Sequence, residues 1–276
     1  MEKYKTLEIV QANSNSQVFN LYLNRPARRN ALSRDFFSEF PRAISSLDQD
    51  PNVSVIVLSG RGDHFCSGID LSTLKDSFGG TKSNNDLGRS AERIRRDVKG
   101  LQAAITALES CRKPVIAGIH GGCIGGGIDL VTACDIRYCT VDSFFSVKEV
   151  DLAIVADLGT LQRLPRIVGF GNAMELALTG RKFSAMEAKS LGLVSRVFDS
   201  KGAMDEFLMG IAEGMAKKSP LAVTGTKAVL LRSRDLTLDQ GLDYVATLNS
   251  VLLQSSDLAE AVSAQIQKRK PVFAKL

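Results

Sequence analysis

Histidine is scarce in this chain, which holds only two among its 276 residues. Mechanisms built on histidine therefore have few candidates, and we expect carboxylates to carry any acid–base chemistry. His120 follows an expected strand, where a structural role is favoured over a catalytic one. His64 lies in a loop, where we expect a solvated side chain.

Cysteine gives no sign of a metal site. The chain has five cysteines, an odd number, and no Cys-x-x-Cys pair. This usage favours a reducing compartment and argues against zinc. No apolar run approaches the roughly 20 residues of a membrane span, and residues 1–5 lack the apolar core of a signal peptide. We therefore expect no metal, and no membrane among the partners.

The charge of the chain is nearly balanced. Lysine and arginine number 35 and the acids 30, which gives a net charge of +5 without a long block of one sign. Such a mild excess suits an anionic ligand as well as nucleic acid and does not choose between them. A hydrophobic content of 44% over 276 residues is enough to bury a substantial core.

Strand and helix patterns alternate along the first 200 residues. Strands are expected at 18–23, 53–58 and 115–119, and shorter ones near 136–139 and 144–147. Helices are expected from Ser33 and over about 86–109. A polar, glycine-rich stretch at 78–85 reads as a loop, and the pattern beyond residue 200 is helical. We therefore expect an α/β core over 1–200 and a C-terminal helical region over 201–276.

The most informative segment is residues 119–130, IHGGCIGGGIDL. Five glycines in seven residues interrupt an apolar strand that leads into an apolar helix, which implies a close approach to the backbone. The helix start offers unpaired N–H groups and a partial positive charge, with Asp129 on its first turn. The segment lacks the Gly-Lys-Ser/Thr ending of a phosphate loop and the glycine spacing of a dinucleotide site. We predict that it holds an oxyanion; a tight turn packed on a neighbour is the alternative.

A second loop, residues 65–71 (FCSGIDL), follows the strand at 53–58 as the glycine run follows the strand at 115–119. Two loops at the ends of two strands can each offer one backbone N–H to the same oxygen. That arrangement is what an oxyanion hole requires.

The order of several motifs makes a family resemblance specific. The motifs are NRP at 24–26, RNAL at 29–32, FCSGIDL at 65–71, KPVIA at 113–117, the glycine run, ACDIR at 133–137 and GTLQRL at 159–164. Together they resemble the crotonase superfamily of enoyl-CoA hydratases and isomerases, over roughly residues 7–270. The resemblance implies a spiral of ββα units, with a C-terminal helical region that completes trimers, often paired into hexamers. It also implies an acyl-CoA substrate, with no cofactor beyond the CoA of the substrate itself.

The resemblance assigns the residues that bind the substrate. In the family, two backbone N–H groups bind the thioester oxygen of a CoA ester, and by motif these belong to Ile69 and Gly126. The rest of the first loop would line the pantetheine and adenine portion of CoA. These residues are Ser67, Gly68, Asp70 and Leu71.

The acids discriminate within the superfamily. Hydratases carry glutamate at the positions of Asp129 and Glu149, and glycine at the position of Asp157. Asp157 lies in the apolar run 152–158, where a charge is costly unless it is paired or functional; a solvated loop residue is the alternative. The three acids together resemble the branch that isomerises 3,5-dienoyl-CoA to 2,4-dienoyl-CoA in the β-oxidation of unsaturated fatty acids. Two other acids have no such support: Asp151 is expected to be a surface charge, and Asp135, close to Arg137, a structural partner.

The reaction implied by this branch removes a proton at C2 and adds one at C6. The intermediate is a dienolate whose charge rests largely on the thioester oxygen, and the loss of one oxyanion donor typically costs about 3–4 kcal/mol. Two acid–base groups suit two distant carbons better than one. We assign Glu149 to C2 and Asp157 to C6, with the reverse order left open, and expect Asp129 to orient or tune the site.

Two other functions fit the same resemblance. A 2-enoyl-CoA hydratase would use Asp129 and Glu149 to position water, but the shortened acid and Asp157 count against it. A non-catalytic scaffold that binds RNA or a protein is the other alternative. The chain has no basic stripe with interleaved aromatics, so we expect no nucleic acid among the partners.

The last three residues, Ala274-Lys275-Leu276, resemble the Ser-Lys-Leu peroxisomal address and follow a basic stretch at 268–270. We therefore expect a peroxisomal protein whose tail binds an import receptor. A β-oxidation compartment would also supply the expected substrate.

Overall fold

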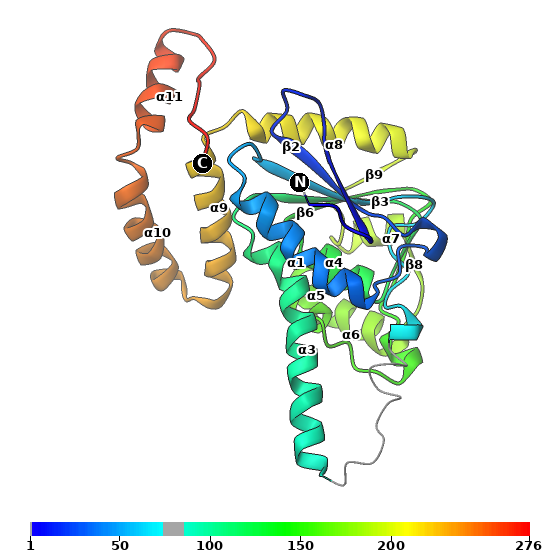
Figure 1. The fold of residues 1–276 in the computed structure, drawn as a ribbon. Coiled ribbons are helices and arrows are strands. Elements are labelled where there is room, and N and C mark those ends of the chain that lie inside the picture. The colour runs from blue at the N-terminus through cyan, green and yellow to red at the C-terminus, as the bar shows by residue number, and fades with distance from the viewer. Residues whose placement is uncertain (1, 74–85) are drawn as a thin grey trace.

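The computed structural model describes residues 2–73 and 86–276 (Figure 1). The loop expected at 78–85 lies outside the described residues. Among the described residues, no helix is both long and apolar enough to cross a membrane.

A six-stranded sheet forms the centre of the molecule, in the order β1-β2-β3-β4-β6-β9. Its strands are β1 (Leu7–Gln11), β2 (Val18–Leu23), β3 (Val55–Gly60), β4 (Val115–Ile119), β6 (Ile136–Thr140) and β9 (Arg196–Phe198). Only the β1–β2 pair within this sheet is antiparallel. Every residue of β3 and β4 is buried, as continuous apolar runs predict for parallel strands covered on both faces.

A smaller sheet is built from segments that directly follow the large one. It contains β5 (Gly122–Ile124), β7 (Phe144–Ser146) and β8 (Phe183–Ser184), in the order β5-β7-β8. The chain passes from β4 to β5 and then into a helix, and from β6 to β7, so two strands of one sheet each lead into the other. The turn between β4 and β5 needs Gly121, because its φ is 55° and a Cβ there would lie 2.1 Å from the Asp63 carbonyl oxygen. These ββα units confirm the expected α/β fold.

Helices cover both faces of the large sheet (Figure 1). The helices of this part of the chain are α1 (Arg34–Gln49), α3 (Leu87–Ser110), α4 (Gly126–Ala133), α5 (Thr160–Val168), α6 (Phe170–Thr179), α7 (Ala185–Ser190) and α8 (Lys201–Ala216). On one face α8 packs Met204, Leu208 and Ala212 against side chains of the strands. The main core lies on the other face, among α1, α3, α4 and α5. Ser33 caps α1 as expected, since its Oγ accepts a hydrogen bond from the N–H of Phe36.

Three helices lie beside this core and carry the C-terminal end of the chain (Figure 1). They are α9 (Pro220–Arg232), α10 (Leu238–Leu252) and α11 (Ser256–Ile266), with a short 3-10 turn, η3 (Ser233–Asp235), after α9. A buried ion pair anchors α9: Lys227 Nζ lies 2.7 Å from Asp135 Oδ2. Asp135 therefore has the structural role that we expected, with Lys227 as its partner.

Candidate active site

The two loops predicted to share one oxyanion lie side by side. The N–H of Cys66 donates to the carbonyl of Gly122 (3.0 Å), and the N–H of Ile124 donates to the carbonyl of Cys66 (2.9 Å). The N–H of Phe65 donates to the carbonyl of His120 (2.8 Å). These bonds fasten the segment after β3 to the segment after β4 and hold the two loops together.

The backbone N–H groups of Ile69 and Gly126 are neighbours in this arrangement. Leu32 holds the first loop, because its N–H donates to Gly68 O (2.8 Å) and its carbonyl accepts from Asp70 N (2.9 Å). Gly126 is the first residue of α4, and a Cβ built on it would lie 3.8 Å from Ile69 N. Among the described residues neither N–H donates a hydrogen bond. Two unpaired N–H groups on adjoining loops are what the predicted oxyanion hole requires.

Both loops open onto a cavity of about 880 Å³. All nine residues that the sequence predicted for the site line it: Ser67, Gly68, Ile69, Asp70, Leu71, Gly126, Asp129, Glu149 and Asp157. Apolar side chains of α3 and of the segment 152–155 complete the wall, and Arg28 and Lys148 add positive charge. The cavity thus combines an oxyanion site, three carboxyls and an apolar surface.

Glu149 starts the short 3-10 helix η2 (Glu149–Leu152) and points at the glycine run. Its Oε1 lies 3.4 Å from the Cβ position of Gly125, and its Oε2 is buried without a hydrogen-bond partner among the described residues. Burial, and then the charge of Asp129, raise the pKa of Glu149 from 4.5 to about 7. A carboxyl with a free oxygen and a pKa near neutrality can exchange a proton with a ligand.

Asp129 is almost fully buried on the first turn of α4. Its Oδ1 accepts two hydrogen bonds from Thr160, from the N–H and from Oγ1, each 2.7 Å long. Burial raises the pKa of Asp129 to about 6, while the bonds from Thr160 act in the opposite direction. This carboxyl is held by α5 and acts on its neighbours mainly through its charge.

Asp157 lies between η2 and α5 and is partly buried. Burial raises the pKa of its carboxyl. Its charge in turn raises the pKa of Asp129 and of Glu149. Its place on the cavity wall argues against the alternative of a freely solvated loop residue. Within residues 2–73 and 86–276, no group of three His, Cys, Asp or Glu residues is placed to hold a metal ion.

Asp70 is engaged within its own loop. Its carboxylate pairs with Arg25 (3.0 Å) and accepts a hydrogen bond from Ser72 Oγ (2.7 Å). The bond from Ser72 and then the contact with Arg25 lower the pKa of Asp70. Arg25 belongs to the NRP motif at 24–26, but sequence reasoning gave it no role. The ion pair ties that motif to the loop that carries Ile69.

The surroundings of the two histidines differ in how well they match the prediction from the sequence. His120 is buried and its Nε2 lies 2.8 Å from the carbonyl oxygen of Gly62, which confirms the structural role. His64 is half-buried rather than freely solvated, and its Nδ1 accepts a hydrogen bond from the N–H of Gly122 (3.0 Å). It therefore helps to hold the glycine run. Asp151 is an exposed surface charge, as expected, and pairs with Lys148.

Comparisons with known proteins identify the family of the chain. Residues 13–275 match the model of a family described as enoyl-CoA hydratase/isomerase. The chain is similar to the peroxisomal Delta(3,5)-Delta(2,4)-dienoyl-CoA isomerase of Arabidopsis thaliana, with 69% identity over all of this chain and 99% of that protein. It is 44% identical to the mitochondrial Delta(3,5)-Delta(2,4)-dienoyl-CoA isomerase of Mus musculus, over 96% of this chain and 81% of that one. A crystal structure of enoyl-CoA hydratase from Bacillus anthracis superposes with a TM-score of 0.88 at 31% identity, over 98% and 99% of the two chains.

Proposed function

The chain belongs to the enoyl-CoA hydratase/isomerase family, and we propose that it is an isomerase that converts 3,5-dienoyl-CoA to 2,4-dienoyl-CoA. The observation that carries this proposal is the position of Asp157. Its carboxyl shares one cavity with Glu149, with Asp129 and with the two N–H groups that can hold a thioester oxygen. The identity of 69% to an isomerase of this specificity, over the whole chain, confirms the activity expected from the sequence.

The reaction uses the site as follows. The thioester oxygen of the substrate accepts hydrogen bonds from the N–H groups of Ile69 and Gly126, which stabilise the charge that develops when C2 loses a proton. Glu149 takes that proton on its carboxylate, the double bonds shift, and Asp157 donates a proton to C6. Glu149 ends protonated and Asp157 ionised, and exchange with solvent restores both. Asp129 raises the pKa of Glu149 and so makes it a stronger base.

The cavity also suits the other parts of an acyl-CoA. Arg28 and Lys148 place two positive charges on its wall, where they would face the phosphates of CoA. Ile94, Val98 and Leu101 of α3 form an apolar wall for the acyl chain. The reaction transfers protons only, without net oxidation or reduction, so the proposed chemistry needs no metal and no redox cofactor.

Assembly into a homo-oligomer is part of the proposal. The helices α10 and α11 and the link between them expose a series of large apolar side chains, which are Leu238, Leu242, Val251, Leu253, Leu258, Val262 and Ile266. Such surfaces mark interaction sites. We infer that further copies of the chain cover them, in the trimer or hexamer that the family resemblance implies.

The protein is peroxisomal, in line with its 69% identity to a peroxisomal isomerase. We propose that an import receptor recognises Ala274-Lys275-Leu276. Removal of these three residues from the full chain should leave it diffuse in cells that lack other copies. Continued import of the shortened chain would show that the address lies elsewhere.

The decisive experiment for the activity is an assay of the purified protein with 3,5-dienoyl-CoA and, separately, with 2-enoyl-CoA. We expect the absorbance of a conjugated 2,4-dienoyl thioester to appear with the first substrate, and only weak hydration of the second. The double variant Glu149→Gln with Asp157→Asn is the control for non-enzymatic isomerisation. Hydration of 2-enoyl-CoA faster than isomerisation would make the protein a hydratase. The absence of both activities would favour a scaffold.

A further inference from the structure

The segment that carries Asp157 has no regular secondary structure of its own. It joins η2 to α5, and two side chains from outside it hold two consecutive carbonyl groups. Gln102 Nε2, on α3, donates to the carbonyl oxygen of Asp157 (2.7 Å). Arg163 Nη1, on α5, donates to the carbonyl oxygen of Leu158 (3.3 Å). The backbone at Asp157 is therefore held from two helices.

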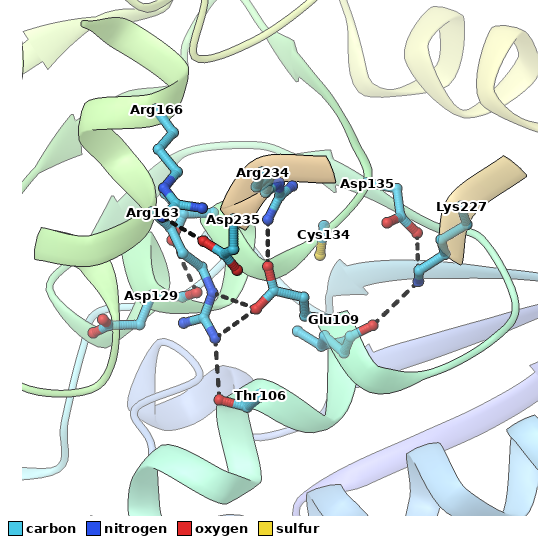
Figure 2. Close-up of polar contacts among 12 residues, drawn as sticks. Thr106, Glu109, Asp129, Cys134, Asp135, Arg163, Arg166, Lys227, Arg234 and Asp235 are labelled. Atoms are coloured by element: carbon cyan, nitrogen blue, oxygen red, sulfur yellow. Dashed lines mark hydrogen bonds and ion pairs between the residues drawn. The ribbon is translucent and has the colours of Figure 1, made fainter. Parts of the chain in front are cut away.

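Arg163 is itself fixed from several sides (Figure 2). Its Nε donates to Glu109 Oε2 (3.1 Å) and its Nη2 to Thr106 Oγ1 (3.0 Å), and the side chain is only 11% exposed. Arg234, from η3 after α9, pairs with the same Glu109. The guanidinium lies against the backbone of Gly159, where a Cβ would come within 1.8 Å of Nη1. The arginine thus forms a rigid support under the segment.

Gln102 lies on the side of this segment that faces away from the proposed substrate. It lines a second, polar cavity of about 500 Å³, together with Thr106, Glu109 and Arg163. The preceding residue on α3, Leu101, lines the substrate cavity instead. Leu158 borders both cavities, so the segment 157–158 is the wall between them. The amide of Gln102 contacts this wall from the side of the polar cavity.

We propose, on the basis of the isomerase function above, that Gln102 is a positioning residue that holds the carboxyl of Asp157 against C6 of the substrate. The bond from Gln102 fixes the carbonyl of the same residue whose carboxyl transfers the proton. Without that donor, a partly buried carbonyl loses its partner and the local backbone relaxes. Proton transfer depends steeply on distance, and a shift of about 1 Å can cost roughly a hundredfold in rate. Arg163 would still hold the next carbonyl, that of Leu158, but it makes no bond to the carbonyl of Asp157.

The test replaces Gln102 by leucine, which keeps the bulk and removes the donor. We expect kcat for 3,5-dienoyl-CoA to fall by roughly 10- to 100-fold while KM changes little. In deuterium oxide, exchange at C2 should continue at nearly the native rate, whereas incorporation of deuterium at C6 should slow with kcat. Gln162→Leu, at an exposed glutamine that lines the same polar cavity, is the matched control and should leave both rates unchanged.

A second variant separates positioning from a general loss of structure. Gln102→Glu keeps the shape, but its carboxyl can donate to the Asp157 carbonyl only when it is protonated. Relative to the native protein, its kcat should therefore fall as the pH rises through the pKa of the introduced carboxyl, while Gln102→Leu stays low at every pH. Equal slowing at C2 and C6, or native turnover in Gln102→Leu, would overturn the proposal. A native protein that does not isomerise the substrate would instead refute the proposed function, and the role of Gln102 with it.

Discussion

The carboxylate of Asp129 receives both of its hydrogen bonds from Thr160, one from the backbone N–H and one from Oγ1, each 2.7 Å long. The bonds join the first turn of α4, directly after the glycine run, to the first residue of α5. The segment that carries Asp157 ends at that same helix. The carboxylate of Asp129 thus links the helix that carries Gly126 to the helix at which the segment of Asp157 ends.

Thr160→Val tests this connection, because it removes the hydroxyl and preserves the N–H and the side-chain shape. We expect a loss of about 1–3 kcal/mol in the free energy of unfolding, since a buried carboxylate loses one of its two donors. The pKa of Asp129 should rise further above about 6, because a bond that lowers it is gone. Urea unfolding at pH 7.5 measures the first effect. Thr226→Val, which removes an exposed helix hydroxyl, is the control and should change stability by less than about 0.5 kcal/mol.

The roles of the two proton carriers can be separated by isotope exchange. Glu149→Gln and Asp157→Asn each keep the side-chain shape and remove the transferable proton. Each should lower isomerisation by roughly 10²- to 10⁴-fold and leave the binding of a CoA ester nearly intact. Exchange of the C2 proton with deuterium should disappear in the Glu149 variant and survive in the Asp157 variant. The opposite pattern would assign Asp157 to C2 and Glu149 to C6. Native turnover in either variant would show that the replaced residue does not transfer a proton.

Glu149 should make the folded protein less stable at neutral and alkaline pH. Its pKa in the folded state is about 7, above the ordinary value of 4.5, so the folded state binds the proton more tightly than the unfolded chain. Stability should therefore fall as the pH rises from about 4.5 to about 7. Glu149→Gln removes the charge, and we expect it to be more stable than the native protein by on the order of 2 kcal/mol at pH 8.5.

Unfolding of the native protein and of Glu149→Gln should be compared at pH 5.0 and at pH 8.5. The gain should shrink at the lower pH, where the native carboxyl is largely protonated. Glu187→Gln is a useful control, because Arg181 lowers the pKa of that half-buried carboxyl. It should not be stabilised at pH 8.5. An equal gain for Glu149→Gln at both pH values would mean that its effect is not electrostatic.

The sequence predicted the long elements and the short strands β6 and β7, but it missed other strands. The strands β2 and β4 begin and end where the apolar patterns predicted, and β3 is displaced by two residues. Residues 7–11 and 196–198 were not predicted as strands. Their burial patterns are mixed, so the chain itself carries little periodic signal. They form strands because β2 and β6 offer partners, and such tertiary pairing is not visible in a local window.

The same distinction applies to the site. The nine residues could be predicted because their motifs follow the order typical of the family, and the structure places all nine on one cavity. Thr160 and Arg163 belong to the GTLQRL motif and Gln102 to none, and the sequence did not show what any of the three contacts. Their partners are 31, 55 and 54 residues away along the chain, and the contacts exist only once α3, α4 and α5 have packed together. His64 was misjudged for the same reason, since its bond to Gly122 spans 58 residues.

At Gly126, the effect of a lost N–H can be separated from the effect of a larger side chain. A Cβ at Gly126 would lie 2.7 Å from Leu32 Cδ1, so Gly126→Ala and Gly126→Pro both displace that side chain. Proline is tolerated at the first position of a helix, and of the two variants only Gly126→Pro removes the proposed oxyanion donor. In a Leu32→Ala background, which makes room for both, we expect Gly126→Pro to turn over about 10²–10³ times more slowly than Gly126→Ala. Circular dichroism and CoA-ester binding should match between the two, and equal turnover in the two folded proteins would exclude the N–H of Gly126 from the oxyanion hole.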